Sequence, residues 1–331
     1  MFASPVVPRI GVSACLLGQE VRFDGGHKRD DFVCDTLAPF VEFVSVCPEV
    51  ELGMGTPREA VRLVQIGRRT HMVGIRSGAD HTDAMARYAA LRVAELAAED
   101  LSGYILKKNS PSCGMERVRL YDINKEGAVP TRLGVGLFAA ALSKRLPLLP
   151  IEEEGRLCDP WLRENFVERV YGYARVRELF TARWRIGDVL RFHFQEKLLL
   201  MAHDQSGQSG QSGCRGYRAL SQLVTQVRDT PRADFATRYQ ALFMAAFAKV
   251  ARTRQQGRVL LHAANHFKKL LDDDGRAELA ALIADYQAGL VPLIVPMTLL
   301  RHYVRLHALD YLKVQTWLTP HPRELMLRNH L

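Results

Sequence analysis

The sequence lacks the features of an exported or membrane-spanning protein. Residues 1–9 do not show a basic region followed by an apolar stretch and a cleavage pattern, so we expect no secretory signal. The most apolar late segment, residues 290–300, is interrupted by Pro292 and Pro296 and falls well short of the roughly 20 apolar residues that cross a bilayer. These absences predict a cytoplasmic protein with no membrane partner.

Cysteine is scarce, and its six residues do not occur in close pairs. A disulfide framework is not expected in a chain of this length without a secretory signal. The C-x-x-C pairs of a zinc ribbon are also missing. Reduced cytoplasmic cysteines are more often catalytic or metal-bound, so the surroundings of each one matter.

The chain has 331 residues, more than one ordinary domain, and its pattern changes once. Up to residue 150, short runs rich in Val and Ile alternate with helical stretches such as residues 83–100, which is typical of a parallel sheet. The stretch 148–155, with proline, three glutamates and glycine, indicates a linker. We therefore predict an α/β, Rossmann-like domain at residues 1–150 and an all-α domain at residues 151–331.

The second domain offers hardly a strand candidate. Asp159 followed by Pro160 is typical of a helix start, and the helix should run to about Trp184. A Gln-Ser-Gly repeat at residues 205–213 predicts a flexible loop without a catalytic role. Further helices are expected at residues 188–201, 217–227, 233–253, 258–271, 276–288 and 296–308.

The net charge of +9 is unevenly distributed. Residues 1–150 hold 19 Lys and Arg against 17 Asp and Glu, which leaves 26 against 19 for residues 151–331. The first part is thus +2 and the second +7. A basic excess in one domain favours binding of a polyanion, but a solvated basic surface has the same composition.

Three cysteines each follow what reads as a buried strand: Cys15, Cys47 and Cys113. In an open α/β sheet the loops at the carboxyl ends of the strands meet in one crevice, where ligands bind. Three thiolates at such a point indicate a metal centre with one position open to substrate. The other cysteines, at positions 34, 158 and 214, are interpreted as packing or exposed residues.

Polar neighbours accompany two of these cysteines. Glu49 lies two residues after Cys47, and Ser110 and Ser112 precede Cys113. A carboxylate and hydroxyls beside a metal centre suit proton transfer and substrate orientation. A helix-capping or surface role is the alternative for Glu49.

Arginines supply the candidate substrate contacts. Arg58, in the second strand-end loop, is a candidate for a nucleotide phosphate, although an ion pair with Glu51 or Glu59 is equally consistent. The helix that begins near residue 160 is rich in arginine and in aromatic residues at helical spacing. We interpret the aromatic residues as core and predict phosphate contacts for the outer-face arginines Arg163, Arg169 and Arg177.

The motifs around these cysteines resemble a known family. Residues 13–18, 46–49 and 110–114 are similar to the TudS-like desulfidases, with the resemblance covering about residues 8–147. Residues from about 159 onward look like the YbgA-like domain, in segments 159–169, 293–300 and 324–329. The two together resemble bacterial enzymes that remove sulfur from 4-thiouridine in tRNA; the Gln-Ser-Gly repeat is extra to the family pattern.

The resemblance implies a [4Fe-4S] cluster held by Cys15, Cys47 and Cys113, with its fourth iron open. Soft thiolates suit such clusters. The implied reaction is non-redox: the sulfur of a thiolated uracil is bound and polarised, water attacks the ring carbon, and hydrosulfide leaves. Glu49 is then the expected general acid/base, and Ser110 or Ser112 orients the substrate or relays its proton.

Two other functions stay open at this point. One is an iron–sulfur protein that binds nucleic acid or senses redox state without turnover. The other is a desulfidase that acts only on free thiouracil. Glu49 and the neighbouring serines favour an enzyme, because a sensor cluster needs no acid/base group and is usually fully ligated. The sequence does not choose between thiolated tRNA and a small thiolated base, and it indicates no oligomeric state.

Overall fold

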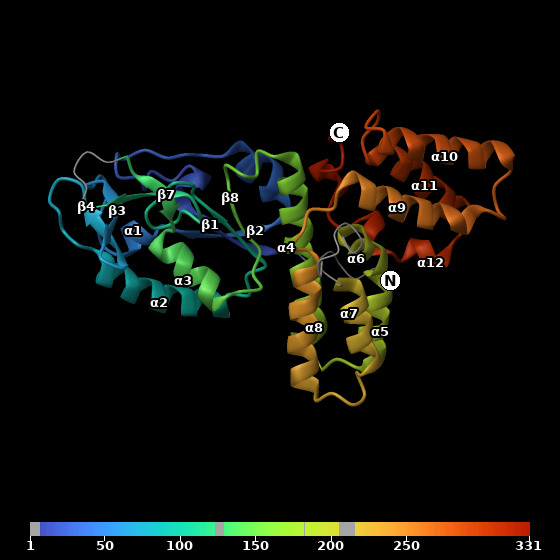
Figure 1. Ribbon diagram of the computed structural model, residues 1–331, viewed down its shortest axis with the longest axis horizontal. Coiled ribbons are helices and arrows are strands. Elements are labelled where there is room, and N and C mark those ends of the chain that lie inside the picture. The colour runs from blue at the N-terminus through green and yellow to red at the C-terminus, as the bar shows by residue number, and fades with distance from the viewer. Residues whose placement is uncertain (1–6, 123–128, 182, 205–215) are drawn as a thin grey trace. The chain divides into compact units, whose positions relative to one another are not determined.

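The computed structural model describes residues 7–122, 129–181, 183–204 and 216–331. The chain forms two compact units, which divide after Asp159 (Figure 1). The Gln-Ser-Gly repeat and Cys214 lie outside the described residues. Within the described part of the chain, every helix is too short or too polar to cross a membrane.

The N-terminal unit contains an all-parallel sheet, sheet A, as the sequence predicts. Its strand order is β2 (Glu42–Val46), β1 (Arg9–Ser13), β5 (Gly103–Leu106) and β8 (Ile151–Glu153). The central strand β5 is buried along its whole length, and four of the five residues of β1 are buried. Strands covered on both faces are built from continuous apolar runs, which explains why they are recognisable in the sequence.

A second sheet, sheet B, is not indicated by the sequence pattern. Its order is β4 (Arg69–Gly74), β3 (Val61–Ile66), β6 (Val118–Asp122) and β7 (Thr131–Gly134). Only β3 and β6 are parallel.

Two helices cover one side of the unit and pack against each other, α2 (Thr82–Ala98) and α3 (Leu137–Arg145) (Figure 1). On α2 the buried side chains recur at helical spacing, at Met85, Ala89 and Val93. This helix closely matches the one expected at residues 83–100.

Short helical turns complete the unit. The 3₁₀ helix η1 (Ala14–Leu17) follows β1, and α1 (Pro48–Glu51) follows β2. The residues around Cys34 form a π-helical segment, Phe32–Leu37, followed by a 3₁₀ turn, Ala38–Phe40.

The acidic stretch expected to be a linker is part of the first unit. Its residues form β8, which pairs with β5, and the chain divides after Asp159 rather than near residue 150. The glutamates have specific partners there: Glu152 accepts a hydrogen bond from Arg156, and Glu153 accepts one from the backbone N–H of Met115. An acidic run can therefore form the end of a strand, with carboxylates that accept hydrogen bonds from other residues of the same unit.

The C-terminal unit is helical in its described residues, as predicted. Its α-helices are α4 (Pro160–Thr181), α5 (Ile186–Gln195), α6 (Lys197–His203), α7 (Gly216–Thr225), α8 (Arg232–Ala246), α9 (Thr253–Ala264), α10 (Asp273–Gln287), α11 (Ile294–Leu306) and α12 (Asp310–Lys313). Three 3₁₀ turns follow α9 or α12, at Asn265–Phe267, Thr316–Leu318 and Arg323–Leu325.

Two expected helices are shorter than the sequence pattern suggests. The helix expected at residues 188–201 is divided at Glu196, whose buried carboxylate accepts hydrogen bonds from Arg175 and Thr316. The helix expected at residues 233–253 ends at Ala246. Beyond it, the carbonyls of Phe247 and Lys249 accept hydrogen bonds from the Asn165 side chain, so the backbone is no longer available to a helix.

A buried ionic network joins the C-terminal segment to α4. Arg328 donates hydrogen bonds to Glu164 at 3.1 Å and to Glu168 at 2.8 Å. Glu168 also lies 2.9 Å from His203, and Glu164 lies 2.9 Å from His330. Arg328 and the neighbouring His203 hold the pKa of Glu168 down to about 2 despite its burial. The two carboxylates are thus stable in the interior because one guanidinium bridges them.

Candidate active site

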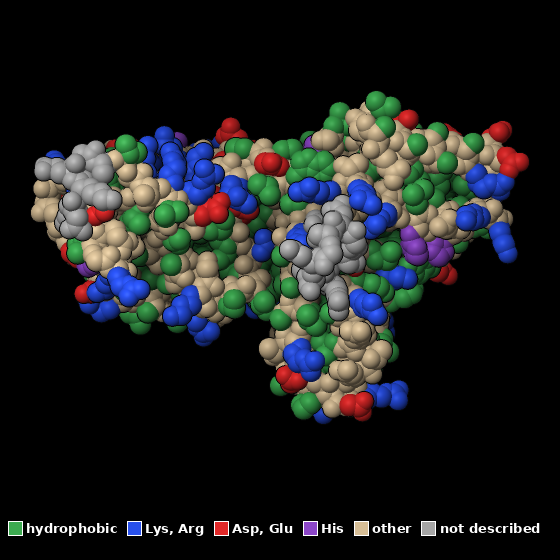
Figure 2. Space-filling model, viewed as in Figure 1, with side chains coloured by type: hydrophobic (Ala, Val, Ile, Leu, Met, Phe, Trp, Pro, Cys, Tyr) green, Lys and Arg blue, Asp and Glu red, His purple; other side chains and the backbone are tan. Residues whose placement is uncertain are grey.

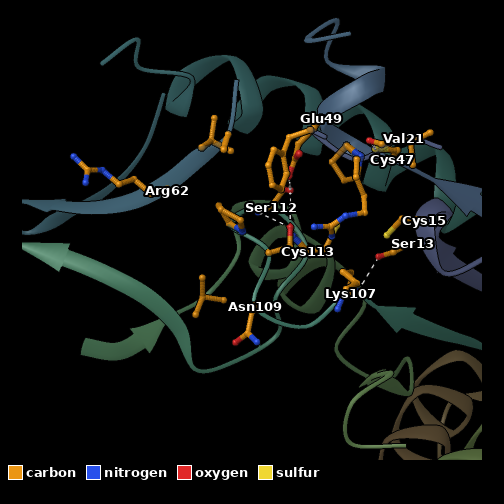
Figure 3. A pocket seen from close by; sticks show the side chains of 18 of the residues that line it. Ser13, Cys15, Val21, Cys47, Glu49, Arg62, Lys107, Asn109, Ser112 and Cys113 are labelled. Atoms are coloured by element: carbon orange, nitrogen blue, oxygen red, sulfur yellow. Dashed lines mark hydrogen bonds between the residues drawn. The ribbon is translucent and has the colours of Figure 1, made fainter. Parts of the chain in front are cut away.

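The three cysteines singled out in the sequence come together at the carboxyl ends of sheet A. Cys15 lies in η1 after β1, Cys47 directly follows β2, and Cys113 lies in the loop after β5. All three line one cavity of about 470 Å³ (Figure 3). Parallel strands therefore deliver residues from three distant parts of the sequence to one place.

The spacing of the sulfurs bears on what they can hold. Among the described residues, only Glu164, Glu168 and His321 place three possible ligand atoms within 4.8 Å of one another. At least one pair of the three cysteine sulfurs is therefore more than 4.8 Å apart, whereas the ligands of a single tetrahedral zinc ion lie about 4 Å apart. A wider spread of soft thiolates fits a multinuclear iron–sulfur cluster.

Burial is the main influence on the pKa values of the three thiols. It raises the pKa of Cys15 to about 11 and also raises the pKa values of Cys47 and Cys113. Lys107 acts in the opposite direction on Cys15. Buried thiols of this kind ionise when a metal centre supplies positive charge, so the donor set fits a cluster as a cofactor.

Glu49 faces the same cavity and is held at both carboxylate oxygens. Its Oε2 accepts hydrogen bonds from the Nη2 and, at 3.1 Å, the Nε of Arg58, and its Oε1 accepts one from the Ser112 hydroxyl. Its side chain is only 14% exposed, which excludes a surface role. The capping alternative fits its neighbour instead, because the backbone N–H of Cys47 donates to Glu51.

The structure distinguishes the two serines that the sequence left equivalent. Ser112 is fully buried and donates to Glu49. The Ser110 hydroxyl lies 3.1 Å from that of Ser112 and accepts hydrogen bonds from the backbone N–H groups of Ser112 and Cys113. Ser110 thus shapes the loop that carries Cys113, and Ser112 is the direct partner of the carboxylate.

Arg58 has a partner that the sequence did not suggest. Besides its two bonds to Glu49, it donates from Nη1 to the carbonyls of Val21 and Gly55, and its side chain is 5% exposed. Neither Glu51 nor Glu59 is its ion-pair partner; Glu59 accepts from the Ser77 backbone and hydroxyl instead. Arg58 therefore fixes Glu49 and the loop around Val21, and its contact to a phosphate stays a prediction.

Three further residues of the site were not singled out from the sequence. Ser13 accepts a hydrogen bond from the backbone N–H of Lys107, and its hydroxyl bonds to Cys113 and lowers the pKa of that thiol. The ammonium of Lys107 pairs with Glu154, which also accepts from the Lys108 backbone. Each lies at or just beyond the end of a parallel strand. The rule that loops at the carboxyl ends of parallel strands meet in one crevice, which predicted the positions of the cysteines, therefore applies to these residues as well.

The remaining candidates lie elsewhere. Cys34 is half-buried and donates to the Leu16 carbonyl at 3.3 Å, and Cys158 is exposed. In the helical unit, Arg163, Arg169 and Arg177 are half-buried on α4 and not on an open outer face, and Arg177 stacks over the Tyr173 ring at 5.4 Å. Their contacts to phosphate stay a prediction.

The cavity is strongly basic. Among the described residues that line it, seven are Lys or Arg, at positions 22, 28, 58, 62, 107, 108 and 119, and only Glu49 is acidic. Three of the cations pair with carboxylates, Arg22 with Asp24, Arg58 with Glu49 and Lys107 with Glu154. Figure 2 shows Lys and Arg side chains gathered on one face of the N-terminal unit. Such a site attracts an anionic substrate.

Comparisons with known proteins divide the chain as the structure does. Residues 10–154 match the family model described as 2-thiouracil desulfurase, and residues 197–322 match a family of unknown function, DUF1722. The chain is 28% identical over 144 residues to the uncharacterized protein YbgA of Escherichia coli (strain K12), covering 43% of this chain and 80% of that protein.

Two further proteins are similar to part of the chain. The uncharacterized protein YbbK of Bacillus subtilis (strain 168) is 34% identical over 108 residues, covering 31% of this chain and 71% of YbbK. A solved structure of a [4Fe-4S]-dependent thiouracil desulfidase, TudS, has 32% sequence identity and a TM-score of 0.38, covering 46% of this chain and 94% of that one.

Proposed function

The chain belongs, through residues 10–154, to the 2-thiouracil desulfurase family, and from this premise we propose that it is an iron–sulfur-dependent desulfidase that converts 4-thiouridine in tRNA to uridine. Water replaces the sulfur of the thiocarbonyl group and hydrosulfide leaves. The reaction requires no net electron transfer.

The proposed cofactor is a [4Fe-4S] cluster held by Cys15, Cys47 and Cys113. The support is the donor set itself: three thiols line one cavity, two of them are buried, and the three sulfurs do not all lie within 4.8 Å of one another, as the ligands of a single zinc ion would. Bound through three thiolates, the cluster would supply an iron without a protein ligand, a Lewis acid for the thiocarbonyl sulfur.

The protein's own groups supply proton transfer and orientation. Glu49 accepts a proton from the attacking water and later returns one to the departing sulfur, which leaves as hydrosulfide. The Ser112 hydroxyl, hydrogen-bonded to Oε1, is placed to relay that proton, and Arg58 fixes the carboxylate through Oε2. Holding the carboxylate at both oxygens limits its rotation, which positions it before the substrate arrives.

The observation that carries the proposal is the hydrogen bond between Ser112 and Glu49 in the cavity that the three cysteines line. An iron–sulfur sensor without turnover has no use for a fixed carboxylate and hydroxyl in an open cavity. Free thiouracil alone as substrate is less well supported, because a neutral base does not need a cavity with seven cations.

For the helical unit we propose recruitment of the RNA. With the division after Asp159, residues 1–159 hold 20 Lys and Arg against 21 Asp and Glu, and residues 160–331 hold 25 against 15. The second unit therefore carries the whole positive excess, +10 against −1. Long-range attraction of a phosphate backbone is the expected consequence.

The test uses protein purified without oxygen and incubated with 4-thiouridine or with thiolated tRNA. We expect stoichiometric release of hydrosulfide and uridine, and about four irons per chain. Iron without hydrosulfide release from either substrate would favour the sensor over the enzyme.

A further inference from the structure

One face of sheet B lies at the cavity and carries groups that the proposed chemistry does not use. Arg62 on β3 and both Arg119 and Tyr121 on β6 line the cavity. The register pairs Leu63 with Leu120, so Arg62 and Arg119 occupy neighbouring positions one residue earlier. Since side chains alternate along a strand, these three residues share one face of the sheet.

Arg62 and Tyr121 form a stacked pair. The guanidinium carbon of Arg62 lies 5.1 Å from the centroid of the Tyr121 ring. The Nε of Arg62 is buried but has no hydrogen-bond partner. An arginine that lies over an aromatic ring is a surface on which a nucleobase can stack.

Three other cations that line the cavity are not neutralised by the protein. Within the described residues, Lys28, Lys108 and Arg119 have no ion pair, and all three are exposed. They come from three separate elements: the loop after η1, the loop after β5 and strand β6. Figure 3 shows Arg62 and Asn109 on the side of the cavity opposite Cys15 and Cys47.

We propose that this face of sheet B, with Arg62, Tyr121 and Arg119, is a second subsite that binds the nucleotide next to the thiolated base in an RNA strand. The inference rests on the proposed function and deepens it. The neighbouring base stacks on the Arg62–Tyr121 pair, and Arg119 contacts the adjoining phosphate. The sulfur-bearing base occupies the cysteine side of the cavity.

An RNA strand explains the positions of these cations better than one free nucleotide does. A single phosphate needs one or two cations, whereas the unpaired cations here lie on three elements around the opening. Stacking on an aromatic face tolerates any base. The subsite therefore selects for RNA of any sequence around the thiolated position.

The first test measures binding of a fluorescein-labelled oligouridylate that contains no sulfur, so that turnover plays no part. Stacking contributes about 1–3 kcal/mol per base, which predicts that Tyr121→Ala weakens binding by about 5- to 150-fold. Tyr121→Phe keeps the ring and should restore most of the affinity. Equal affinity of Tyr121→Ala and the full-length wild-type protein would overturn the proposal.

Charge reversal provides the matched comparison. Arg119→Glu should weaken oligouridylate binding and reduce the slope of affinity against salt by at least about 0.7, the value for one phosphate contact on a single strand. Arg87→Glu, on the exposed face of α2 and away from the cavity, makes the same change in net charge and should have little effect. Equal losses in both variants would show only a general charge effect and would overturn the proposal.

Turnover measurements distinguish the second subsite from the proposed desulfidase activity on which it rests. We expect wild-type kcat/KM to be higher for a trinucleotide with central 4-thiouridine than for 4-thiouridine itself. Tyr121→Ala and Arg62→Ala should each lower that ratio about tenfold or more. An unchanged ratio with normal hydrosulfide release overturns the subsite alone, and no hydrosulfide from either substrate overturns the proposed function.

Discussion

The two units differ in whether their buried or converging polar groups have partners within the protein. In the helical unit, each buried carboxylate meets a guanidinium: Glu164 and Glu168 share Arg328, and Glu196 pairs with Arg175. In the described part of the N-terminal unit, three thiols and three cations without an ion pair, Lys28, Lys108 and Arg119, line one cavity. Paired buried charges fix a structure, whereas convergent groups without partners mark the place where a ligand completes the site.

Net charge alone would have placed the basic cavity in the helical unit. The helical unit carries +10 and the N-terminal unit −1, yet the basic cavity belongs to the N-terminal unit. The charge at a site depends on which side chains the strand ends bring together. The net charge of a domain determines only its long-range attraction for a charged partner.

The largest expected effect is loss of the metal centre. Cys15→Ala, Cys47→Ala and Cys113→Ala should each abolish iron binding and desulfuration, because each removes one of three proposed thiolate ligands. Cys34→Ala and Cys158→Ala are matched controls, since neither lines the cavity. Iron content and absorbance of protein prepared without oxygen measure the result. Iron loss in a control variant with retention in one of the first three would refute the ligand assignment.

The next effect tests the helical unit. Arg328→Ala leaves Glu164 and Glu168 buried without their common partner, which should lower the free energy of unfolding of this unit by about 3–5 kcal/mol. Arg323→Ala, at an exposed position, should change it by less than about 0.5 kcal/mol. Urea unfolding followed by circular dichroism gives the values. Similar stability of both variants would mean that the network does not stabilise the unit.

A smaller effect separates chemistry from cluster binding. Glu49→Gln should keep its iron but lose on the order of a hundredfold in turnover, because the amide no longer accepts the proton. Glu95→Gln, an exposed carboxylate on α2, serves as the control. Ser112→Ala should reduce turnover more than Ser110→Ala, since Ser112 is the residue that donates to Glu49. Full activity of Glu49→Gln would remove that residue from the mechanism.

The smallest expected effect is a pH dependence in the helical unit. Burial, with Lys197 nearby, lowers the pKa of His193 to about 4 from an ordinary value of 6.5. The unfolded chain therefore binds more protons at this residue between these values, so the contribution of His193 to stability falls as pH drops from about 6.5 to 4 and changes no further below that. His193→Gln should show a smaller decrease in melting temperature over this range. Identical pH profiles would mean that His193 is not buried in the neutral form.

The cysteines and Glu49 could be predicted because they obey a local rule: each follows a recognisable apolar strand. The pairing of Arg58 with Glu49 could not, since it depends on the path of the loop between α1 and β3 and not on spacing in the sequence. Sheet B was missed because its strands are partly exposed and mostly antiparallel.

Two other differences have the same physical origin. The run Glu152 to Glu154 has the composition of a linker, but its carboxylates bind Arg156, a backbone amide and Lys107. The arginines of α4 were expected on an open face, yet α4 is packed against both α5 and α8. Composition does not show which polar groups find partners after folding.

The most direct measurement compares desulfuration of intact 4-thiouridine tRNA by the full-length protein and by residues 1–159, at equal iron content. We expect hydrosulfide release from free 4-thiouridine by both proteins, and a much lower rate on tRNA for the shorter one. Equal rates on tRNA would contradict recruitment by the helical unit, and absence of hydrosulfide from both substrates would contradict the desulfidase itself.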